Sequence, residues 1–493
     1  MVACMAAACS RGGEDASSPV APGRPGEVRV GVGEDIWPLT GQGPTSRHFA
    51  AGELNVGVYE PLLSLGPDYS LRPGLAERWE LVGPTTWRFH LRRGVTFHDG
   101  RPFGADDVVW SWSREALIRS VGGTLDRVVK VDDLTVDFVL TAPSLRLPEQ
   151  LVHPEGPIVP RNGHNDSEPA VGTGPFRLVE YQPRRQVVVE RFDGYWGAKA
   201  EAQRVTFKFL PDAGVRLEAL RGGEVDIMTG VPREQATAVE GEGFRLVRAQ
   251  PGATQALAFD TDGPFGDDRS VRQAVSLAVD RRRYVAEVLG GNGEPGRWMS
   301  PPAVLGAAAS SVEPPAFDPA RARQVLDEAG WRAGPDGVRA KGTRRLDLVL
   351  LGGPAAPEAG LQLVADQLRD VGIETNVRKA YDIRTGEENR RRGYDLDLST
   401  ANQNDASPAF LLTSRDVPGP AYAALVTQAV TAPTREEVQR AAAAMTRVLV
   451  NEQFLVVPLA SVFHIYAMHD GVDLAEPHPS SINQTWVTLR PPR

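Results

Sequence analysis

The sequence predicts an α/β fold from three observations. Residues 86–112 have the pattern of a strand, turns and a helix, because apolar side chains first alternate with polar ones and then recur every three to four residues. Residues 346–377 have the pattern of a strand, an amphipathic helix and a second strand, which is a β-α-β unit with parallel strands. After about Phe259, helical and strand-like patterns alternate along the chain. Such alternation is typical of α/β proteins.

The first of these units is assigned from individual residues. The apolar members of its strand alternate with arginine and histidine, and they are Trp87, Phe89 and Leu91. Gly94 and the pair Asp99–Gly100 predict turns. Asp106–Asp107 then begins a helix, because the helix dipole favours negative charge there, and Val108 and Trp112 share the buried face.

Other elements follow from the same kinds of pattern. Asp318 predicts the N-cap of a helix that starts at Pro319, and Thr434 with Glu437 predicts a capping box at the start of another helix. Further strands are predicted at residues 27–33, 136–140, 187–189, 205–209 and 394–399.

Composition limits the classes of partner. The chain has 493 residues, 41% of them hydrophobic and 24% charged, which is ordinary for a globular protein with a large core. No apolar run approaches the ~18 residues that a membrane span needs. The net charge is −9 and the basic residues are scattered, so we expect no nucleic-acid partner.

The motifs give no sign of catalysis. The 8 histidines have no HExxH or similar ligand spacing, and both cysteines lie at positions 4 and 9, outside the expected folded body. No GxSxG, P-loop or Cys-His arrangement is present. Gly172–Pro175 matches only part of a dinucleotide fingerprint, and His98–Asp99 fits a turn better than an acid–base pair. We therefore expect no cofactor, no metal site and no enzymatic activity.

The residue order of the first unit is more specific than its pattern. LRRGVTFHDGRPFGADDVVWSW, at residues 91–112, resembles the signature segment of the family 5 extracellular solute-binding proteins. These proteins are the peptide, oligopeptide and nickel receptors of ABC importers. The resemblance spans roughly residues 27–486, because other blocks of the family are matched in the same order at residues 59–81, 171–197, 259–281 and 317–331.

The resemblance implies a two-lobed periplasmic-binding-protein type II fold, with an extra subdomain on the first lobe. Residues 1–26 would be a lipoprotein signal remnant and a flexible tether. Residues 49–163 would form the extra subdomain, and residues 259–459 the second lobe. The first lobe would combine three stretches, 27–48, 164–258 and 460–493.

The resemblance also implies a function. The protein would be an extracytoplasmic, monomeric receptor that captures a peptide or peptide-like solute in the cleft between its lobes by hinge closure. It would then deliver the solute to the permease subunits and ATPase of an ABC importer. Two alternatives from other classes stay open: a ligand sensor or surface-interaction lipoprotein, and a secreted hydrolase on the same scaffold.

The loop after strand 394–399 is the main candidate ligand contact, because ligands collect at the carboxyl ends of strands in open α/β sheets. In peptide-binding members of the family this loop has a tryptophan and an aspartate that binds the ligand's ammonium group. Here those positions correspond to Ala401 and Asn404, with Asp405 one residue later. Either Asp405 has taken over this role or the ligand has no free ammonium group. Asn402 is a further candidate, and a simple turn is the alternative for all three polar residues.

Other candidate contacts lie elsewhere in the chain. Glu34 and Trp37 follow the first strand, Tyr381 follows the strand near Val377, and Gln255 lies at the crossing between lobes as a hinge residue or a ligand contact. The histidine spacing leaves a nickel ligand open only through a chelator or a dispersed site.

The N-terminal segment predicts a lipid anchor. Small residues at positions 6–8 precede Cys9, and a tether rich in Ser, Pro, Gly and Ala follows it, which is how a bacterial lipoprotein signal ends. The basic and apolar regions that such a signal needs are missing before Cys9. We expect lipidation of Cys9, rather than of Cys4, when expression begins at an upstream start, and hence a protein anchored to the outer face of the cell membrane, or a periplasmic one.

Overall fold

The structure is a computed structural model of the chain. It describes residues 26–33, 57–66, 68–113, 125–152, 158–161, 170–249, 252–353, 356–380, 383–402, 419–432, 434–474 and 489–491.

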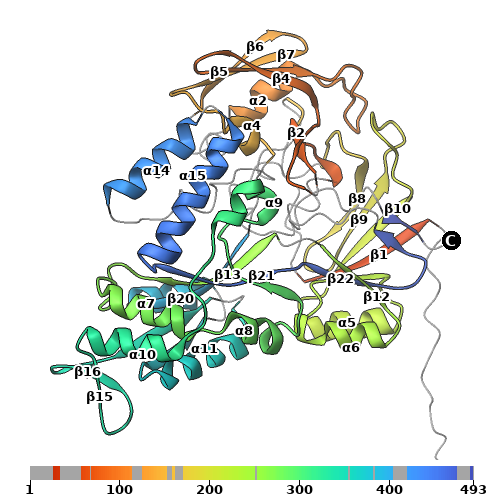
Figure 1. Ribbon diagram of the computed structural model, residues 1–493. Coiled ribbons are helices and arrows are strands. Elements are labelled where there is room, and N and C mark those ends of the chain that lie inside the picture. The colour runs from red at the N-terminus through yellow and green to blue at the C-terminus, as the bar shows by residue number, and fades with distance from the viewer. Residues whose placement is uncertain are drawn as a thin grey trace, which may run out of the picture.

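One lobe, which we call the first lobe, is built on a seven-stranded sheet of order β12-β22-β11-β1-β10-β9-β8 (Figure 1). β1 runs parallel to β10 and β11, and the other pairs are antiparallel. Helices α5 (Ala213–Arg221) and α6 (Ala236–Gly241) cover one face. The strands are β1 Glu27–Val32, β8 Phe176–Gln182, β9 Gln186–Arg191, β10 Arg204–Phe209, β11 Ile227–Thr229, β12 Arg245–Arg248 and β22 Ile465–Met468.

The second lobe is built on a six-stranded sheet of order β14-β21-β13-β20-β18-β19. Figure 1 shows α7, α8, α10 and α11 below this sheet and α14 and α15 above it. The strands are β13 Ala253–Phe259, β14 Gly293–Pro295, β18 Asp347–Gly352, β19 Glu374–Lys379, β20 Leu396–Asn402 and β21 Val456–Val462. The helices are α7 Arg269–Ala278, α8 Arg281–Val288, α9 Pro302–Leu305, α10 Pro319–Glu328, α11 Glu358–Asp370, α12 Ile383–Arg391, α14 Pro420–Thr431 and α15 Arg435–Arg447.

A smaller body, which we call the subdomain, lies at the top of Figure 1 and contains a four-stranded antiparallel sheet of order β4-β5-β7-β6. Its apolar face packs on the predicted helix, whose Val108 and Trp112 are both buried. Its elements are β2 Leu63–Leu65, β3 Leu71–Pro73, β4 Ala76–Gly83, β5 Thr86–Leu91, α2 Ala105–Trp112, β6 Leu125–Asp132, β7 Thr135–Leu140 and α4 Leu147–Gln150.

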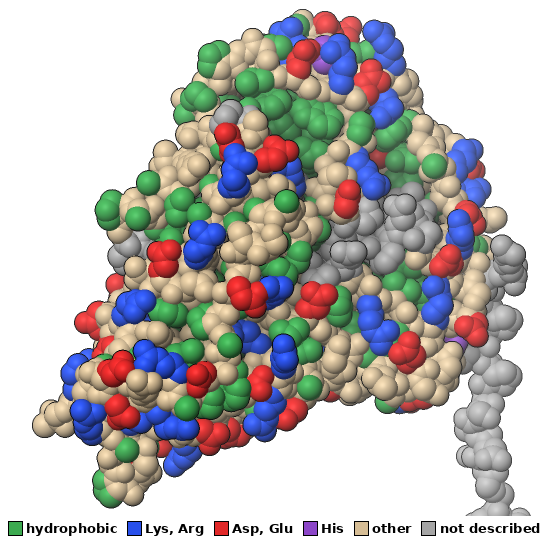
Figure 2. All heavy atoms as spheres, viewed as in Figure 1, with side chains coloured by type: hydrophobic (Ala, Val, Ile, Leu, Met, Phe, Trp, Pro, Cys, Tyr) green, Lys and Arg blue, Asp and Glu red, His purple; other side chains and the backbone are tan. Residues whose placement is uncertain are grey.

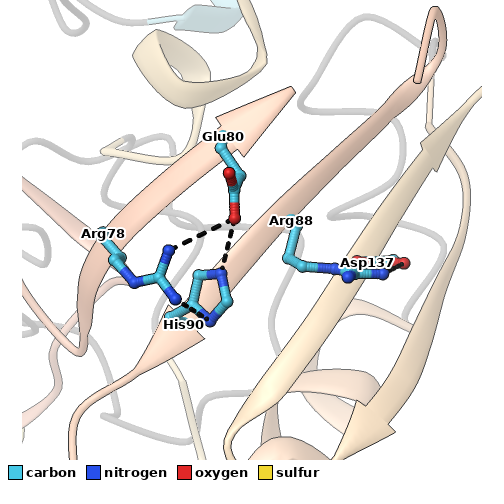
Figure 3. A network of polar contacts seen from close by, with 5 residues as sticks. All are labelled: Arg78, Glu80, Arg88, His90 and Asp137. Carbon is cyan, nitrogen blue, oxygen red and sulfur yellow. Dashed lines mark hydrogen bonds and ion pairs between the residues drawn. The ribbon is translucent and has the colours of Figure 1, made fainter. Parts of the chain in front are cut away.

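The outer face of the subdomain sheet carries charged side chains that pair across strands (Figure 3). The ring of His90 lies between Arg78 and Glu80, with Nδ1 3.1 Å from the arginine Nη2 and Nε2 3.0 Å from the carboxylate. Arg88 donates from Nε to Asp137 at 2.7 Å. Cross-strand pairs of this kind support a sheet that packs on one face only.

Short elements complete the fold. They are η1 Arg233–Gln235, η2 Gly306–Ser311 and the π-helical turn η3 Val448–Glu452, with small strands β15 Arg332–Ala333, β16 Arg339–Lys341, β17 Arg344–Arg345, β23 Asp473–Leu474 and β24 Leu489–Arg490. Within the described part of the chain, no helix is long and apolar enough to cross a membrane.

Several local predictions are confirmed. β18, α11 and β19 form the predicted β-α-β unit, and the two strands pair in parallel from Asp347 opposite Glu374. The carboxylate of Asp318 accepts from the amide of Arg321 at 2.8 Å and caps α10. Thr434 caps α15 by accepting from the amide of Glu437 at 3.3 Å.

β20 is longer than we predicted. We expected a strand over residues 394–399 and a loop from Thr400, but the strand continues to Asn402. The reason is its antiparallel partner β13, which pairs Gln255 with Thr400 and Ala253 with Asn402 and so satisfies the backbone groups of these residues. The backbone of Asn402 therefore belongs to the end of a strand, not to the predicted loop.

The chain crosses between the two large sheets after β12 and again after β21. β13 and β21 both belong to the six-stranded sheet. Sheet pairing therefore places these crossings before Ala253 and after Val462, a few residues outside the boundaries at 258/259 and 459/460 that we expected.

Candidate functional site

The carboxyl ends of parallel strands meet at one edge of each large sheet. In the first lobe these strands are β1, β10 and β11, which end at Val32, Phe209 and Thr229. In the second lobe they are β18, β19 and β20, which end at Gly352, Lys379 and Asn402. Ligands of open α/β sheets bind at such edges, so these are the places where a solute is expected to bind.

Most of the predicted contacts follow these strand ends in the chain. Glu34 and Trp37 come after β1, Tyr381 comes after β19, and Asn404 and Asp405 come after β20. All five lie outside the described residues, as does Cys9. Asn402 is described as the last residue of β20. Their part in binding stays a prediction.

Gln255 is described in full and lies in β13 with 2% of its surface exposed. Its Oε1 accepts a hydrogen bond at 3.1 Å from the hydroxyl of Tyr284, which is fully buried in α8. Burial raises the pKa of Tyr284, so this hydroxyl stays protonated and remains a donor. The described contact of Gln255 is thus made inside the second lobe.

A buried arginine binds the carbonyl groups at the strand ends of the first lobe. Arg216 of α5 is 7% exposed, and its guanidinium donates to the carbonyls of Leu210 at 2.6 Å, Pro211 at 2.9 Å and Thr229 at 3.2 Å. A Cβ on Gly33 would lie 2.8 Å from Nη1 of Arg216. The guanidinium therefore occupies the space that a side chain at position 33 would need. Burial lowers the pKa of Arg216. The arginine holds the ends of β10 and β11 beside that of β1.

A lysine lies at the corresponding edge of the second lobe. Lys379 ends β19, and its ammonium group donates to the carbonyls of Gly353, at 2.8 Å, and of Ala356. Burial lowers its pKa. Both contacts follow the end of β18, so Lys379 joins the ends of two parallel strands. Lys379 lies two residues beyond the predicted end of this strand at Val377, so the sequence pattern did not identify it.

Arg216 was also missed, although the sequence contains a signal. It lies four residues before Leu220 in α5, and both side chains are buried on one face of the helix. A lone arginine on an apolar helix face must find internal acceptors. Here they are the carbonyls at strand ends.

Polar contacts connect the two lobes beside the crossings. The side-chain amide of Asn292, which follows α8, donates to the carbonyl of Arg233 at 2.8 Å. Its Oδ1 accepts from Nε of Arg248, in β12, at 2.9 Å. Arg233 in turn donates to the carbonyl of Phe463 at 3.2 Å, between β21 and β22. These contacts join the two lobes beside both crossings.

A buried carboxylate connects the subdomain to the first lobe. Glu60 is 6% exposed and accepts hydrogen bonds from the hydroxyls of Thr173 at 2.9 Å and Tyr195 at 2.8 Å, and from Nε1 of Trp196 at 2.8 Å. Burial raises the pKa of Glu60 to about 7, although the three donors oppose this shift. The guanidinium of Arg92 lies 4.2 Å from the ring centroid of Trp196.

The described residues offer little for metal chemistry. Among them, no group of three or more His, Cys, Asp or Glu side chains could hold a metal ion. His98 is engaged with the backbone, because its Nε2 lies 3.0 Å from the carbonyl of Gly174 and its Nδ1 accepts from the amide of Gly172 at 3.3 Å. Burial lowers the pKa of His98 to about 4, so it is neutral at ordinary pH.

The face shown in Figure 2 has mixed charge. Over its described part, Lys and Arg side chains are interspersed with Asp and Glu, and hydrophobic side chains gather near the top, over the subdomain. Binding of nucleic acid relies on clustered basic residues, and this face has no large basic patch among the described residues.

Known proteins resemble this chain along most of its length. A dipeptide-binding protein of Escherichia coli strain K12 is 32% identical over 299 residues, which are 53% of this chain and 55% of that protein. Protein XP55 of Streptomyces lividans is 30% identical over 380 residues, which are 72% of this chain and 66% of that protein. The matched regions thus span less than two thirds of these relatives.

Solved structures agree with the fold. The crystal structure of NikA from Brucella suis in complex with Fe(III)-EDTA has a TM-score of 0.84 and 24% sequence identity, and the match covers 94% of this chain and 99% of that one. The fold is therefore the two-lobed type II fold of periplasmic binding proteins, as predicted. Residues 70–419 match the model of the bacterial extracellular solute-binding proteins, family 5. With this match over most of its length, the chain belongs to that family.

Proposed function

We propose that this protein is the extracytoplasmic receptor of an ABC importer, and that it captures a peptide or peptide-like solute between its lobes. The observation that carries this proposal is the family match over residues 70–419. The names of relatives point to the same class of ligand, since they include a dipeptide-binding protein, a di/tripeptide-binding protein of Pseudomonas aeruginosa and a glutathione-binding protein of Salmonella choleraesuis.

The proposed mechanism is hinge closure without chemical change of the solute. A ligand that touches both lobes stabilises the closed form in proportion to the contacts that it makes only there. In our proposal, the contacts come from Glu34, Trp37, Tyr381 and the loop with Asn404 and Asp405, which follow strand ends in both lobes. A monomer is sufficient for this mechanism, and it would hand the solute to the permease.

The residues at the ammonium-binding position favour a restricted ligand class. A buried ammonium group needs a charged partner, and loss of that partner costs about 2–5 kcal/mol. Asn404 offers only a neutral acceptor. We infer that the solute is peptide-like and either lacks a free ammonium group or binds it through Asp405.

Native mass spectrometry of freshly purified protein tests the function. We expect a co-purified solute of peptide-like size, and a rise in melting temperature with members of a panel of free and N-acetylated di- and tripeptides. Replacing both Asn404 and Asp405 with Ala should weaken binding of the best panel member by at least ~1 kcal/mol. No bound solute, together with no melting shift across peptides, chelates and sugars, would contradict the proposal; peptide turnover would instead favour a hydrolase.

We further propose that Cys9 receives a lipid that anchors the protein outside the cell membrane. The support is the run of small residues before Cys9 and the tether after it. When the gene is expressed from an upstream start, a fatty-acid probe should label the protein but not its Cys9→Ser variant. Equal labelling of the two proteins would contradict this anchor.

A further inference from the structure

The subdomain touches the second lobe through α9, a short helix that contributes to two hydrophobic cores. Val304 is fully buried in the core of the subdomain, in the same cluster as Leu147 of α4. The next residue, Leu305, is fully buried in the core of the second lobe. The carbonyl of Val304 accepts from Nε2 of Gln439 at 2.9 Å, and this bond holds α9 against α15.

An ion pair joins the same two bodies. Arg435, in the first turn of α15, donates from Nη1 to Oε1 of Glu149 in α4. Figure 1 shows the upper end of α15 close to α4. The side chain of Glu149 is only 11% exposed and that of Arg435 is 34% exposed. Water therefore screens this pair less than a surface pair.

The junction of the subdomain with the first lobe is of a different kind. There, Glu60 accepts three side-chain hydrogen bonds, from Thr173, Tyr195 and Trp196. The amide of His98 donates to the carbonyl of Gly172, and that of Gly174 donates to the carbonyl of Val58. Between the subdomain and the second lobe, by contrast, no backbone hydrogen bond is present among the described residues. The junction with the second lobe is the one that can separate without breaking backbone pairing.

We propose that Val304, Arg435 and Glu149 form a releasable latch that holds the second lobe on the subdomain in the closed form and sets the ratio of closed to open molecules. The inference rests on the proposed two-lobed receptor. When the lobes separate, Val304 leaves the subdomain core and the ion pair breaks. When they close, both contacts form again at a distance from the hinge contacts of Asn292. Closure is then favoured by the protein itself as well as by its solute.

Charge reversal and charge exchange test the latch without any ligand. Small-angle X-ray scattering would compare the parent protein with Arg435→Glu, Glu149→Arg and the variant that carries both changes. We expect a larger radius of gyration for each single variant, with about a fivefold fall in the ratio of closed to open molecules. The double variant should return toward the parent value, because the pair is restored with exchanged charges.

Two further variants serve as controls for nonspecific effects of charge and for unfolding. Arg440→Glu makes the same charge change on the exposed side of α15, where the side chain is 64% exposed, and should leave the scattering unchanged. Arg435→Met keeps an apolar stem and removes the ion pair without reversing the charge. It replaces Arg435→Glu in the test if the reversed charge unfolds the protein, and it should give a smaller expansion than a charge reversal. Equal radii of gyration for the parent, Arg435→Met and a folded Arg435→Glu would overturn the latch, as would a double variant as expanded as the single ones. A failure of solute binding in every protein would count against the receptor function instead.

Discussion

The ionisation of Glu60 is linked to the stability of the fold, because its carboxyl group is buried. Its pKa of about 7 exceeds the ordinary 4.5 because burial removes the carboxylate from water. The donors belong to residues 173, 195 and 196, which are far from Glu60 in the chain. Local sequence patterns therefore could not predict these contacts. What the sequence did predict at this scale was burial that follows local periodicity, such as that of Val108 and Trp112.

The raised pKa of Glu60 predicts a pH dependence of stability. Between about pH 4.5 and 7 the unfolded chain has lost the proton while the folded protein still holds it, so the free energy of unfolding falls as the pH rises through this window. At most about 3 kcal/mol is involved. Glu60→Gln removes this contribution. Chemical denaturation at pH 5 and pH 7.5 should therefore show a smaller decrease in the free energy of unfolding between these pH values for the variant than for the parent.

The exposed Glu77→Gln should keep the parent's pH dependence and serves as the control. If the Glu60 variant and the parent lose equal stability between the two pH values, the carboxylate is not protonated in the folded protein at pH 5.

Gly33 gives a second prediction at the scale of one residue. An alanine Cβ there would lie 2.8 Å from Nη1 of Arg216. The guanidinium cannot move away without breaking hydrogen bonds to several carbonyls. Gly33→Ala should lower the free energy of unfolding by about 1–3 kcal/mol. Gly241→Ala in α6, where a Cβ meets nothing within 4 Å, should cause no loss. A neutral Gly33→Ala would mean that Arg216 can move away.

At the scale of elements, the sequence was most informative where a pattern is local. The β-α-β unit of β18, α11 and β19 was predicted because each element carries its own periodicity and α11 connects parallel neighbours. The end of β20 was placed three residues early, because its pairing with β13 depends on a segment far away in the chain. β19 was likewise predicted to end too early, at Val377, and Lys379 was therefore not identified as a strand-end residue.

The cap of α15 gives a prediction for an element. Thr434 accepts from the amide of Glu437, one of the donors that a helix start leaves without an internal partner. Thr434→Ala should destabilise the protein by about 1 kcal/mol in thermal or chemical unfolding. Thr434→Ser keeps the hydroxyl and should retain most of the stability. Equal losses in the two variants would assign the effect to the methyl group instead of the cap.

At the scale of the whole molecule, the resemblance predicted the two-lobed fold, which periodicity alone could not provide. The crossings between sheets are set by pairing between distant strands, such as β13 with β20 and β21. The candidate contacts could be assigned from chain position after strand ends. The contacts that connect the bodies, at Glu60, Asn292 and Val304, could not, because each depends on partners that are remote in sequence.

The hinge contacts of Asn292 give a prediction at this scale. Asn292→Ala leaves the carbonyl of Arg233 and Nε of Arg248 without this partner, which should cost about 2 kcal/mol. Amide hydrogen exchange should become faster at residues 245–249 and 289–293. Asn451→Ala removes a side chain that donates to the carbonyl of Glu313 within the second lobe, and should leave both segments unchanged. Unchanged exchange in the Asn292 variant would show that the asparagine does not hold the hinge.

The position of Val304 in the chain has a consequence for biosynthesis. The strands of the subdomain are translated long before α9, yet their core is complete only when Val304 enters it. If the four-stranded sheet of the subdomain forms before residue 304 has been translated, the apolar surface that Val304 covers is open to water. We expect chaperones that bind uncovered apolar surface to recognise such an intermediate.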